Sequence, residues 1–113
     1  LNGCSADIIV EDGLGPVIHD SGSMIRITKE AAKKTLGSNA LIELGPNLGG
    51  DTFASSSSRI PGIYARLGVR KPGMPADKQY MLHDDRFDFD DSIVLPKGTA
   101  LFIQVVMDYF GIS

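Results

Sequence analysis

The residue best suited to chemistry is His83, which precedes a run of carboxylates and aromatic rings at residues 84–91. A neutral imidazole can bind a divalent metal or act as a general base, and a nearby carboxylate can hold its second nitrogen. By chemistry alone, a histidine in a polar loop is more often a surface residue. Nothing else in the sequence completes a site around His83, so we expect the chain to be a piece of a larger catalyst.

The acidic residues that follow His83 have a structural interpretation that we favour. Asp88 and Asp90 alternate with Phe87 and Phe89, which is the two-residue period of an extended segment with one buried side. The two rings are therefore expected to be buried and the two carboxylates to face water. A metal-ligand role for either aspartate is the less favoured alternative.

A second candidate is the turn formed by Gly49 and Gly50, followed by Asp51 at the expected start of a short helix. Glycines let a ligand approach backbone N–H groups, and the amino end of a helix attracts negative charge. We therefore take Gly49, Gly50 and Asp51 as candidate substrate-binding residues, with a plain turn as the alternative. The segment lacks the lysine of a phosphate loop and the third glycine of a dinucleotide-binding motif.

Other reactive residue types have weaker claims. His19 beside Asp20 is a conceivable acid–base pair, although a helix-capping role for Asp20 is favoured. No Gly-x-Ser-x-Gly motif occurs, which disfavours a serine hydrolase. Cys4 is the single cysteine, so an internal disulfide and a zinc site made of several thiolates are excluded. A reducing, cytoplasmic setting is the expectation that follows.

Two segments have the periodicity of helices. From Ser23 onward apolar side chains recur on one face, and Gly37 suits the left-handed end of such a helix. A second helix is expected from Pro96, a residue tolerated in a first helical turn, to Gly111. Because apolar residues lie on most faces of this second helix, we expect it to be largely buried.

Three short runs next to glycine and proline, the first of them β-branched, predict strands at residues 6–11, 40–44 and 63–67. Strands alternating with helices predict a layered α/β fold with a mixed sheet. The exposed edges of such a sheet favour self-association, so a homodimer is also expected.

Composition limits the class of protein. The 113 residues suffice for one ordinary domain. The 42% hydrophobic and 22% charged residues are typical of a soluble protein, and no apolar run reaches the ~20 residues that a membrane span needs. The net charge of -3, with scattered lysines and arginines, gives no basic stripe of the kind that binds nucleic acid. Neither nucleic acid nor a membrane is therefore an expected partner.

A series of motifs resembles the carboxy-terminal end of the metal-dependent aminoacylase/carboxypeptidase family, in its hippurate-hydrolase and N-acyl-amino-acid amidohydrolase branch. Residues 15–20 (GPVIHD) resemble that branch's Pro-Pro-x-x-Asn-Asp, and residues 48–54 (LGGDTFA) resemble its Met-Gly-Gly-Glu-Asp-Phe-Ala. Residues 60–62 (IPG) are similar to its Val-Pro-Gly, and residues 82–91 (LHDDRFDFDD) to its His-His-Ser-Pro-x-Phe-Asp-Phe-Asp-Glu. The resemblance covers nearly the entire chain.

The resemblance implies a partial catalytic domain of a two-metal, aminopeptidase-like hydrolase. Residues 1–20 would be the end of a lid-domain strand and its return linker, and residues 21–113 the carboxy-terminal part of the catalytic domain. His83 would be the last ligand of two divalent ions, zinc, manganese or cobalt, that serve the hydrolysis of small N-acyl amino acids or related amides. The other ligands and the catalytic glutamate would lie outside this chain, so no catalytic residue is assigned within it and the isolated chain is expected to be inactive.

Departures from the family pattern bear on activity. Leu82 replaces the first histidine of the pair, His19 replaces asparagine, and Asp51-Thr52 replaces Glu-Asp. A divergent specificity or a loss of activity would account for them. The alternatives to a hydrolase segment are a non-catalytic folded fragment or interaction domain, and a small-molecule binding module that uses the glycine turn.

Overall fold

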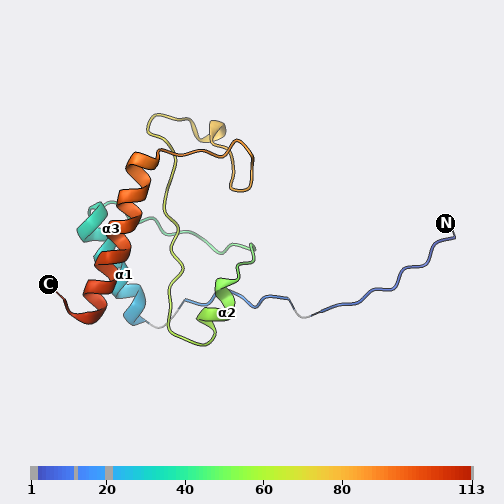
Figure 1. Cartoon of the computed structure of the whole chain (residues 1–113). Helices are drawn as coiled ribbons and strands as arrows, with labels where there is room; N and C mark the ends of the chain where they lie inside the picture. The colour runs from blue at the N-terminus through green and yellow to red at the C-terminus, as the bar shows by residue number, and fades with distance from the viewer. Residues whose placement is uncertain (1–2, 12, 20–21, 113) are drawn as a thin grey trace.

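The computed structural model describes residues 3–11, 13–19 and 22–112 (Figure 1). Its elements are helices α1 (Gly22–Leu36), α2 (Phe53–Ser57) and α3 (Asp91–Phe110), and one turn of 3-10 helix, η1 (Ala76–Lys78). No β-strand occurs within these described ranges, so the observed fold is all-helical. The predicted layered α/β fold with a mixed sheet is therefore wrong.

The three predicted strands, at residues 6–11, 40–44 and 63–67, are irregular segments instead. In the first of them Ile8, Ile9 and Val10 are 86%, 84% and 89% exposed. β-Branched residues form a strand only where a neighbouring strand takes up their backbone N–H and C=O groups. None of the three segments has such a neighbour in the described structure. The sheet edges that suggested a homodimer are absent there for the same reason.

Helix α1 confirms the first predicted helix. Ala31 and Ala32 are buried on one side, while the basic residues of the helix are exposed. The helix ends at Gly37, which has φ 99° and whose N–H donates to the carbonyl of Lys33 at 3.1 Å. Glycine adopts this left-handed conformation without a steric penalty, as expected for a helix stop. The capping role predicted for Asp20 lies outside the described residues.

Helix α3 begins at Asp91 rather than at Pro96. Asp90 caps it, because its Oδ1 accepts hydrogen bonds from the Ser92 backbone N–H at 3.1 Å and the Ser92 hydroxyl at 2.6 Å. This cap satisfies a donor that the first turn of a helix leaves unpaired. Pro96 consequently lies inside the helix, where it withholds one backbone donor. At the other end Gly111 has φ 65°, which confirms the predicted left-handed stop.

The packing of α1 against α3 is the sole contact between regular elements in the described ranges. At one end Lys34 Nζ donates to Asp108 Oδ1 at 2.6 Å, and Gln104 Nε2 donates to the same oxygen at 2.8 Å. The Asp108 side chain is only 15% exposed, so this ion pair is partly shielded from water. Further along α3, a Cβ at Gly98 would lie 3.2 Å from Leu67 Cδ2. Glycine there lets the segment that carries Leu67 approach the helix closely.

The molecule has little interior. Its Cα radius of gyration is 18.8 Å, whereas a compact chain of this length has about 13 Å. The buried residues within the described ranges are Thr28, Ala31, Ala32 and Ala54. Three alanines and a threonine remove little apolar surface from water, and burial stabilises a fold by only about 25 cal/mol per Å². The described residues therefore lack the core expected of an independent domain.

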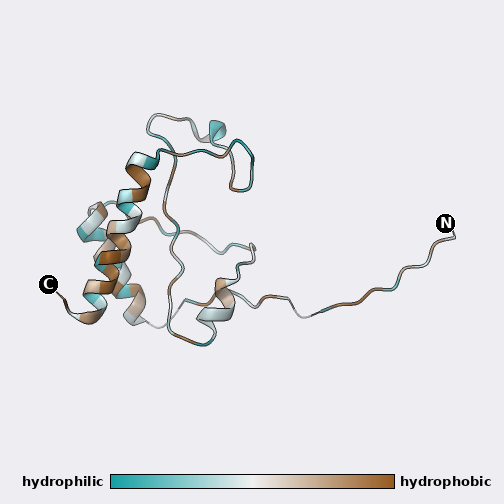
Figure 2. Cartoon of the chain, viewed as in Figure 1, coloured by the Kyte–Doolittle hydropathy of each residue, from teal (hydrophilic) through white to brown (hydrophobic). Residues whose placement is uncertain are grey.

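Helix α3 has apolar residues along its length (Figure 2). Its less exposed side includes Leu101 and Val105 and continues to Asp108, which meets α1. No described residue of α3 is buried, so the expectation that this helix is largely buried is wrong. The reason is that α1 covers one side and no other described helix contacts α3. We define the outer face of α3 by these exposed apolar residues: Leu95, Phe102, Ile103, Val106, Tyr109 and Phe110.

By length and composition alone α3 is apolar enough to cross a membrane. Polar residues, among them Lys97 and Asp108, interrupt its apolar ones, so the helix contains no continuous apolar run of that length. A charged side chain inside a bilayer costs several kcal/mol unless it has a partner, and Asp108 is paired with Lys34 of α1. The expectation that a membrane is not a partner stays a prediction.

We predict that neighbouring substitutions on the two sides of α3 have different effects. Leu101→Ser removes apolar packing on the α1 side and should lower the free energy of unfolding by about 1–2 kcal/mol. In the isolated chain Phe102→Ser removes a ring that is 77% exposed, so stability should change by less than about 0.5 kcal/mol, and any self-association through this face should decrease. Chemical denaturation and sedimentation measure the two effects. An equal loss of stability in both variants would contradict this assignment of faces.

Asp108 provides a pH test of the contact between α1 and α3. The hydrogen bond from Lys34, followed by that from Gln104, lowers the pKa of the Asp108 carboxyl. Its stabilising contribution is therefore present above the ordinary aspartate pKa of about 3.9 and is lost as the pH falls through the lowered pKa. Asp108→Asn should flatten this acid dependence in a circular dichroism titration, with Asp85→Asn as the control at an exposed carboxylate. An unaltered acid profile in Asp108→Asn would refute the role.

Candidate functional site

His83 lies in a tight turn of the loop before α3. The backbone N–H of Asp84 donates to the carbonyl of Met81 at 3.1 Å, and His83 between them has φ 75°. This left-handed conformation costs an L-amino acid about 1–2 kcal/mol, and no other described residue except glycine adopts it. The His83 side chain is exposed, and no hydrogen bond or ion pair joins it to another described residue. Its ring nitrogens are therefore available to a ligand.

The carboxylate next to His83 is already engaged by Arg86. The Arg86 guanidinium donates to both oxygens of Asp84, from Nε at 2.9 Å and from Nη2 at 3.0 Å. The same guanidinium lies 4.1 Å from the centre of the Tyr80 ring. The hydrogen bonds from Arg86 lower the pKa of Asp84. Asp84 therefore holds the turn together and does not hold the His83 imidazole.

The alternation predicted at residues 87–90 is confirmed only in part, because Asp88 is exposed whereas Asp90 is half-buried. The rings of Phe87 and Phe89 pack with their centroids 6.0 Å apart, although both remain half-buried. Asp88 is exposed and forms an ion pair with Lys71, which lowers the pKa of the Asp88 carboxyl. Asp90 caps α3. Each aspartate thus has a structural partner, which agrees with the interpretation favoured over metal binding.

The described residues do not form a complete metal site. No group of three histidine, cysteine, aspartate or glutamate side chains lies together there in a way that could hold a metal ion. A catalytic zinc ion typically uses about three protein ligands. The exposed imidazole of His83 fits one position of such a site, so the remaining ligands would have to come from other polypeptide.

The glycine turn precedes α2, the short helix expected at this position. Asn47 Oδ1 accepts a hydrogen bond from the Gly49 N–H at 2.6 Å, and a Cβ at Gly49 would lie 2.7 Å from that oxygen. A side chain at position 49 would therefore displace the Asn47 side chain from this hydrogen bond. A Cβ at Gly50 would meet no atom within 4 Å, so the backbone is open to approach there. Of the two glycines, Gly50 is better placed to meet a ligand.

Asp51 connects segments that are far apart in the sequence. Its Oδ1 accepts from the backbone N–H of Phe53 at 2.7 Å, and its Oδ2 accepts from the Tyr64 hydroxyl at 3.0 Å. The backbone N–H of Tyr64 donates to His19 Nδ1 at 3.3 Å. The rings of Phe53 and Tyr64 pack with their centroids 5.7 Å apart. We call His19, Asp51, Phe53 and Tyr64 the Tyr64 cluster.

Tyr64 was not among the predicted site residues, because residues 63–67 were predicted to form a strand. The one signal available was its position next to the Pro-Gly turn that ends at Gly62. A Cβ at Gly62 would lie 3.1 Å from Phe53 Cζ, so glycine lets that ring approach. The hydrogen bond to Asp51 raises the pKa of the Tyr64 hydroxyl. No hydrogen bond, ion pair or ring contact links the Tyr64 cluster to His83 in the part of the chain that is described.

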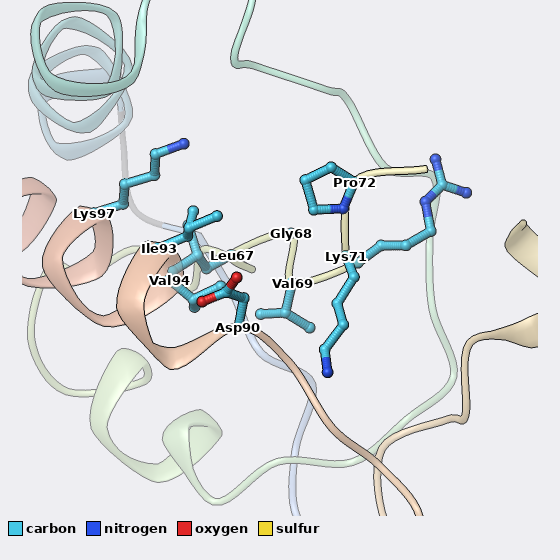
Figure 3. A pocket seen from close by; sticks show the side chains of 10 residues that line it. Leu67, Gly68, Val69, Lys71, Pro72, Asp90, Ile93, Val94 and Lys97 are labelled. Atoms are coloured by element: carbon cyan, nitrogen blue, oxygen red, sulfur yellow. The ribbon is translucent and has the colours of Figure 1, made fainter. Parts of the chain in front are cut away.

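A hollow of about 150 Å³ lies between residues 67–72 and the first turns of α3 (Figure 3). Neither His83 nor any member of the Tyr64 cluster lines it. The ammonium groups of Lys71 and Lys97 point in different directions, so they do not form a joint site for an anion. Small-molecule sites usually measure about 300–1,000 Å³, which makes this hollow too small to hold a substrate by itself.

Comparison with known proteins relates the chain to a hydrolase. It is 30% identical over 103 residues to "Uncharacterized hydrolase y4tI" of Sinorhizobium fredii, a match that covers 91% of this chain and 24% of that protein. It is also 31% identical over 84 residues to a Rhodococcus jostii protein whose name is that of a glutamate–cysteine ligase, covering 66% of this chain and 10% of that protein. No family model and no solved structure matches.

These matches establish a distant homology and no family membership. The chain spans about a quarter of the length of the hydrolase and about a tenth of the length of the second protein. A hydrolase relationship is thus supported over most of this chain, while the reaction and the substrate belong to the proposal below.

The Tyr64 hydroxyl provides a test of the cluster. Because its pKa is raised, the hydrogen bond to Asp51 should stabilise the fold below the ordinary tyrosine pKa of about 10 and be lost as the pH rises through the raised value. Ultraviolet titration of tyrosinate, compared between the wild type and Tyr64→Phe, isolates this group. In Asp51→Asn the Tyr64 midpoint should move to lower pH. An unmoved midpoint would contradict the bond to Asp51.

Proposed function

We propose that this chain is the carboxy-terminal portion of a metal-dependent amidohydrolase or peptidase that hydrolyses N-acyl amino acids or related amides. The homology to a hydrolase over 91% of the chain supports the reaction class. The order of the motifs between residues 15 and 91 supports the amide substrate. In this proposal His83 is a metal ligand, and Gly50 and Asp51 line the substrate.

The observation that carries the proposal is the conformation of His83. Its backbone has a φ of 75°, which glycine or asparagine would adopt at less cost, yet the residue is a histidine with no described partner for its ring. The tight turn requires the positive φ, but it does not require an imidazole at this position. The imidazole is accounted for if the turn aims it at a ligand outside the described residues.

The proposed cofactors are two divalent ions, zinc, manganese or cobalt. When bound, such a pair activates water for attack on an amide carbonyl. Within this chain His83 would coordinate a metal ion through one ring nitrogen. The Arg86–Asp84 pair would stabilise the turn that contains His83. Because one ligand does not retain a catalytic metal, the isolated chain is proposed to be inactive.

The outer face of α3 supports a larger catalytic unit. Its rings and aliphatic side chains are exposed in this chain, and the matched hydrolase has about three-quarters of its length outside the aligned segment. We propose that polypeptide of that remainder covers the outer face. The division at residue 20 between lid and catalytic parts, the cytoplasmic setting and a homodimer remain predictions.

A second candidate function is a non-catalytic interaction domain. The same outer face of α3 favours it, since exposed apolar patches commonly mark protein contacts. The two functions differ in the sequence encoded before Leu1. A His-x-Asp motif and a Glu-Glu pair encoded upstream in the same reading frame would favour the hydrolase. An upstream reading frame that continues without either motif would favour the interaction domain.

His83 is tested in the full-length protein that carries this chain, with two substitutions of different backbone preference. His83→Ala removes the imidazole and keeps the strained conformation, whereas His83→Gly removes the imidazole and relieves about 1 kcal/mol of strain. Both variants should bind less metal per protein molecule than the wild type and should turn over N-benzoylglycine more than about 10-fold more slowly. Metal analysis, turnover assays with zinc, manganese and cobalt, and thermal unfolding provide the measurements.

The glycine variant separates chemistry from stability. It should unfold at the same temperature as the wild type or higher, and still lose metal and activity. Unchanged metal content and turnover in His83→Gly would remove His83 from the site. Activity lost in the alanine variant and retained in the glycine variant would assign a purely structural role.

A further inference from the structure

His19 has one ring nitrogen fixed by the fold. The backbone N–H of Tyr64 donates to its Nδ1 at 3.3 Å, so Nδ1 is an acceptor and carries no proton. In a neutral imidazole the other nitrogen must then carry the hydrogen. His19 therefore presents an Nε2–H donor, and its side chain is exposed.

The donor belongs to the same cluster as the proposed substrate-binding residues. Tyr64 donates one hydrogen bond from its backbone to His19, which lies 45 positions earlier, and one from its hydroxyl to Asp51, which lies 13 positions earlier. These bonds connect the two residues through Tyr64. Asp51 directly follows Gly50, where the backbone is open. An Nε2–H donor and an open backbone are thus held on one connected framework.

The charge of the cluster indicates which ligand atom suits this donor. Asp51 is an acidic residue at its centre, and both of its oxygens already accept hydrogen bonds. A ligand carboxylate placed there would meet a like charge, which is unfavourable at short range. A neutral amide carbonyl oxygen accepts a hydrogen bond from an imidazole N–H without that repulsion.

We propose that His19 is a substrate-binding residue whose Nε2–H donates to the amide carbonyl oxygen of an N-acyl amino acid. This rests on the proposed hydrolase function and adds a residue to its binding site. Tyr64 and Asp51 act through His19: the Tyr64 N–H selects the tautomer, and Asp51 holds Tyr64 in place.

Two variants of the full-length protein separate the donor from the framework. In His19→Asn the side-chain oxygen can still accept from the Tyr64 N–H, and the amide Nδ2–H donors that remain lie on a shorter side chain, so no N–H reaches the position of the His19 Nε2. In His19→Ala the acceptor and the donors are both lost. Since one hydrogen bond is worth about 1 kcal/mol, His19→Asn should raise KM for N-benzoylglycine and for its uncharged carboxamide by about fivefold at unchanged unfolding temperature. His19→Ala should show the same rise in KM together with a lowered unfolding temperature.

Nitrogen-15 NMR of the imidazoles provides a readout independent of turnover. Wild-type His19 should be the Nε2–H tautomer, and titration with N-benzoylglycine should shift its Nε2 signal. An Nδ1–H tautomer, an unmoved Nε2 signal on addition of the ligand, or an unaltered KM in His19→Asn would each overturn the proposal. A shifted Nε2 signal without turnover of any N-acyl amino acid would support the binding role of His19 and reject the proposed hydrolase function.

Discussion

The packing of α1 against α3 is the constraint on which the rest of the structure depends. No other pair of regular elements in the described residues is in contact, and the Lys34–Asp108 ion pair fixes one end of it. The irregular segments attach to this pair of helices through a few contacts. Leu67 lies against Gly98 of α3, and Asp90 joins the His83 loop to the start of the same helix. The placement of His83 relative to α1 therefore depends on the packing of α3 against that helix.

The helices could be predicted because their information lies within each segment. Ala31 lies on the predicted apolar face of α1, and glycines end both α1 and α3 as predicted. Each of these features depends only on residues nearby in the sequence. Strands could not be predicted in this way, since residues 8–10 have the side chains of a strand but no neighbour to bond. The start of α3 was misplaced because Asp90 was assigned to the alternating segment, whereas its side chain serves as a cap.

In the candidate site, too, the residues that lie in local motifs could be predicted from the sequence. His83 and Asp51 stand in motifs that mark them, and the structure gives each a defined geometry. Tyr64 has no such motif, because its role consists of bonds to residues 13 and 45 positions away. The pairing of Arg86 with Asp84 was also missed, since a sequence does not state which of several cations a carboxylate will meet. Interactions between distant segments are what local patterns leave out.

The contacts that hold this protein together join residues far apart in the sequence, and this separation affects the rate of folding. The Lys34–Asp108 contact closes a loop of 74 residues, and the bond between Tyr64 and His19 closes one of 45. Helices form within about a microsecond, whereas contacts between distant segments must first overcome the entropy of loop closure. Proteins dominated by such non-local contacts fold slowly. The helices of this chain should therefore form early, and the docking of α3 onto α1 should follow as the slower step.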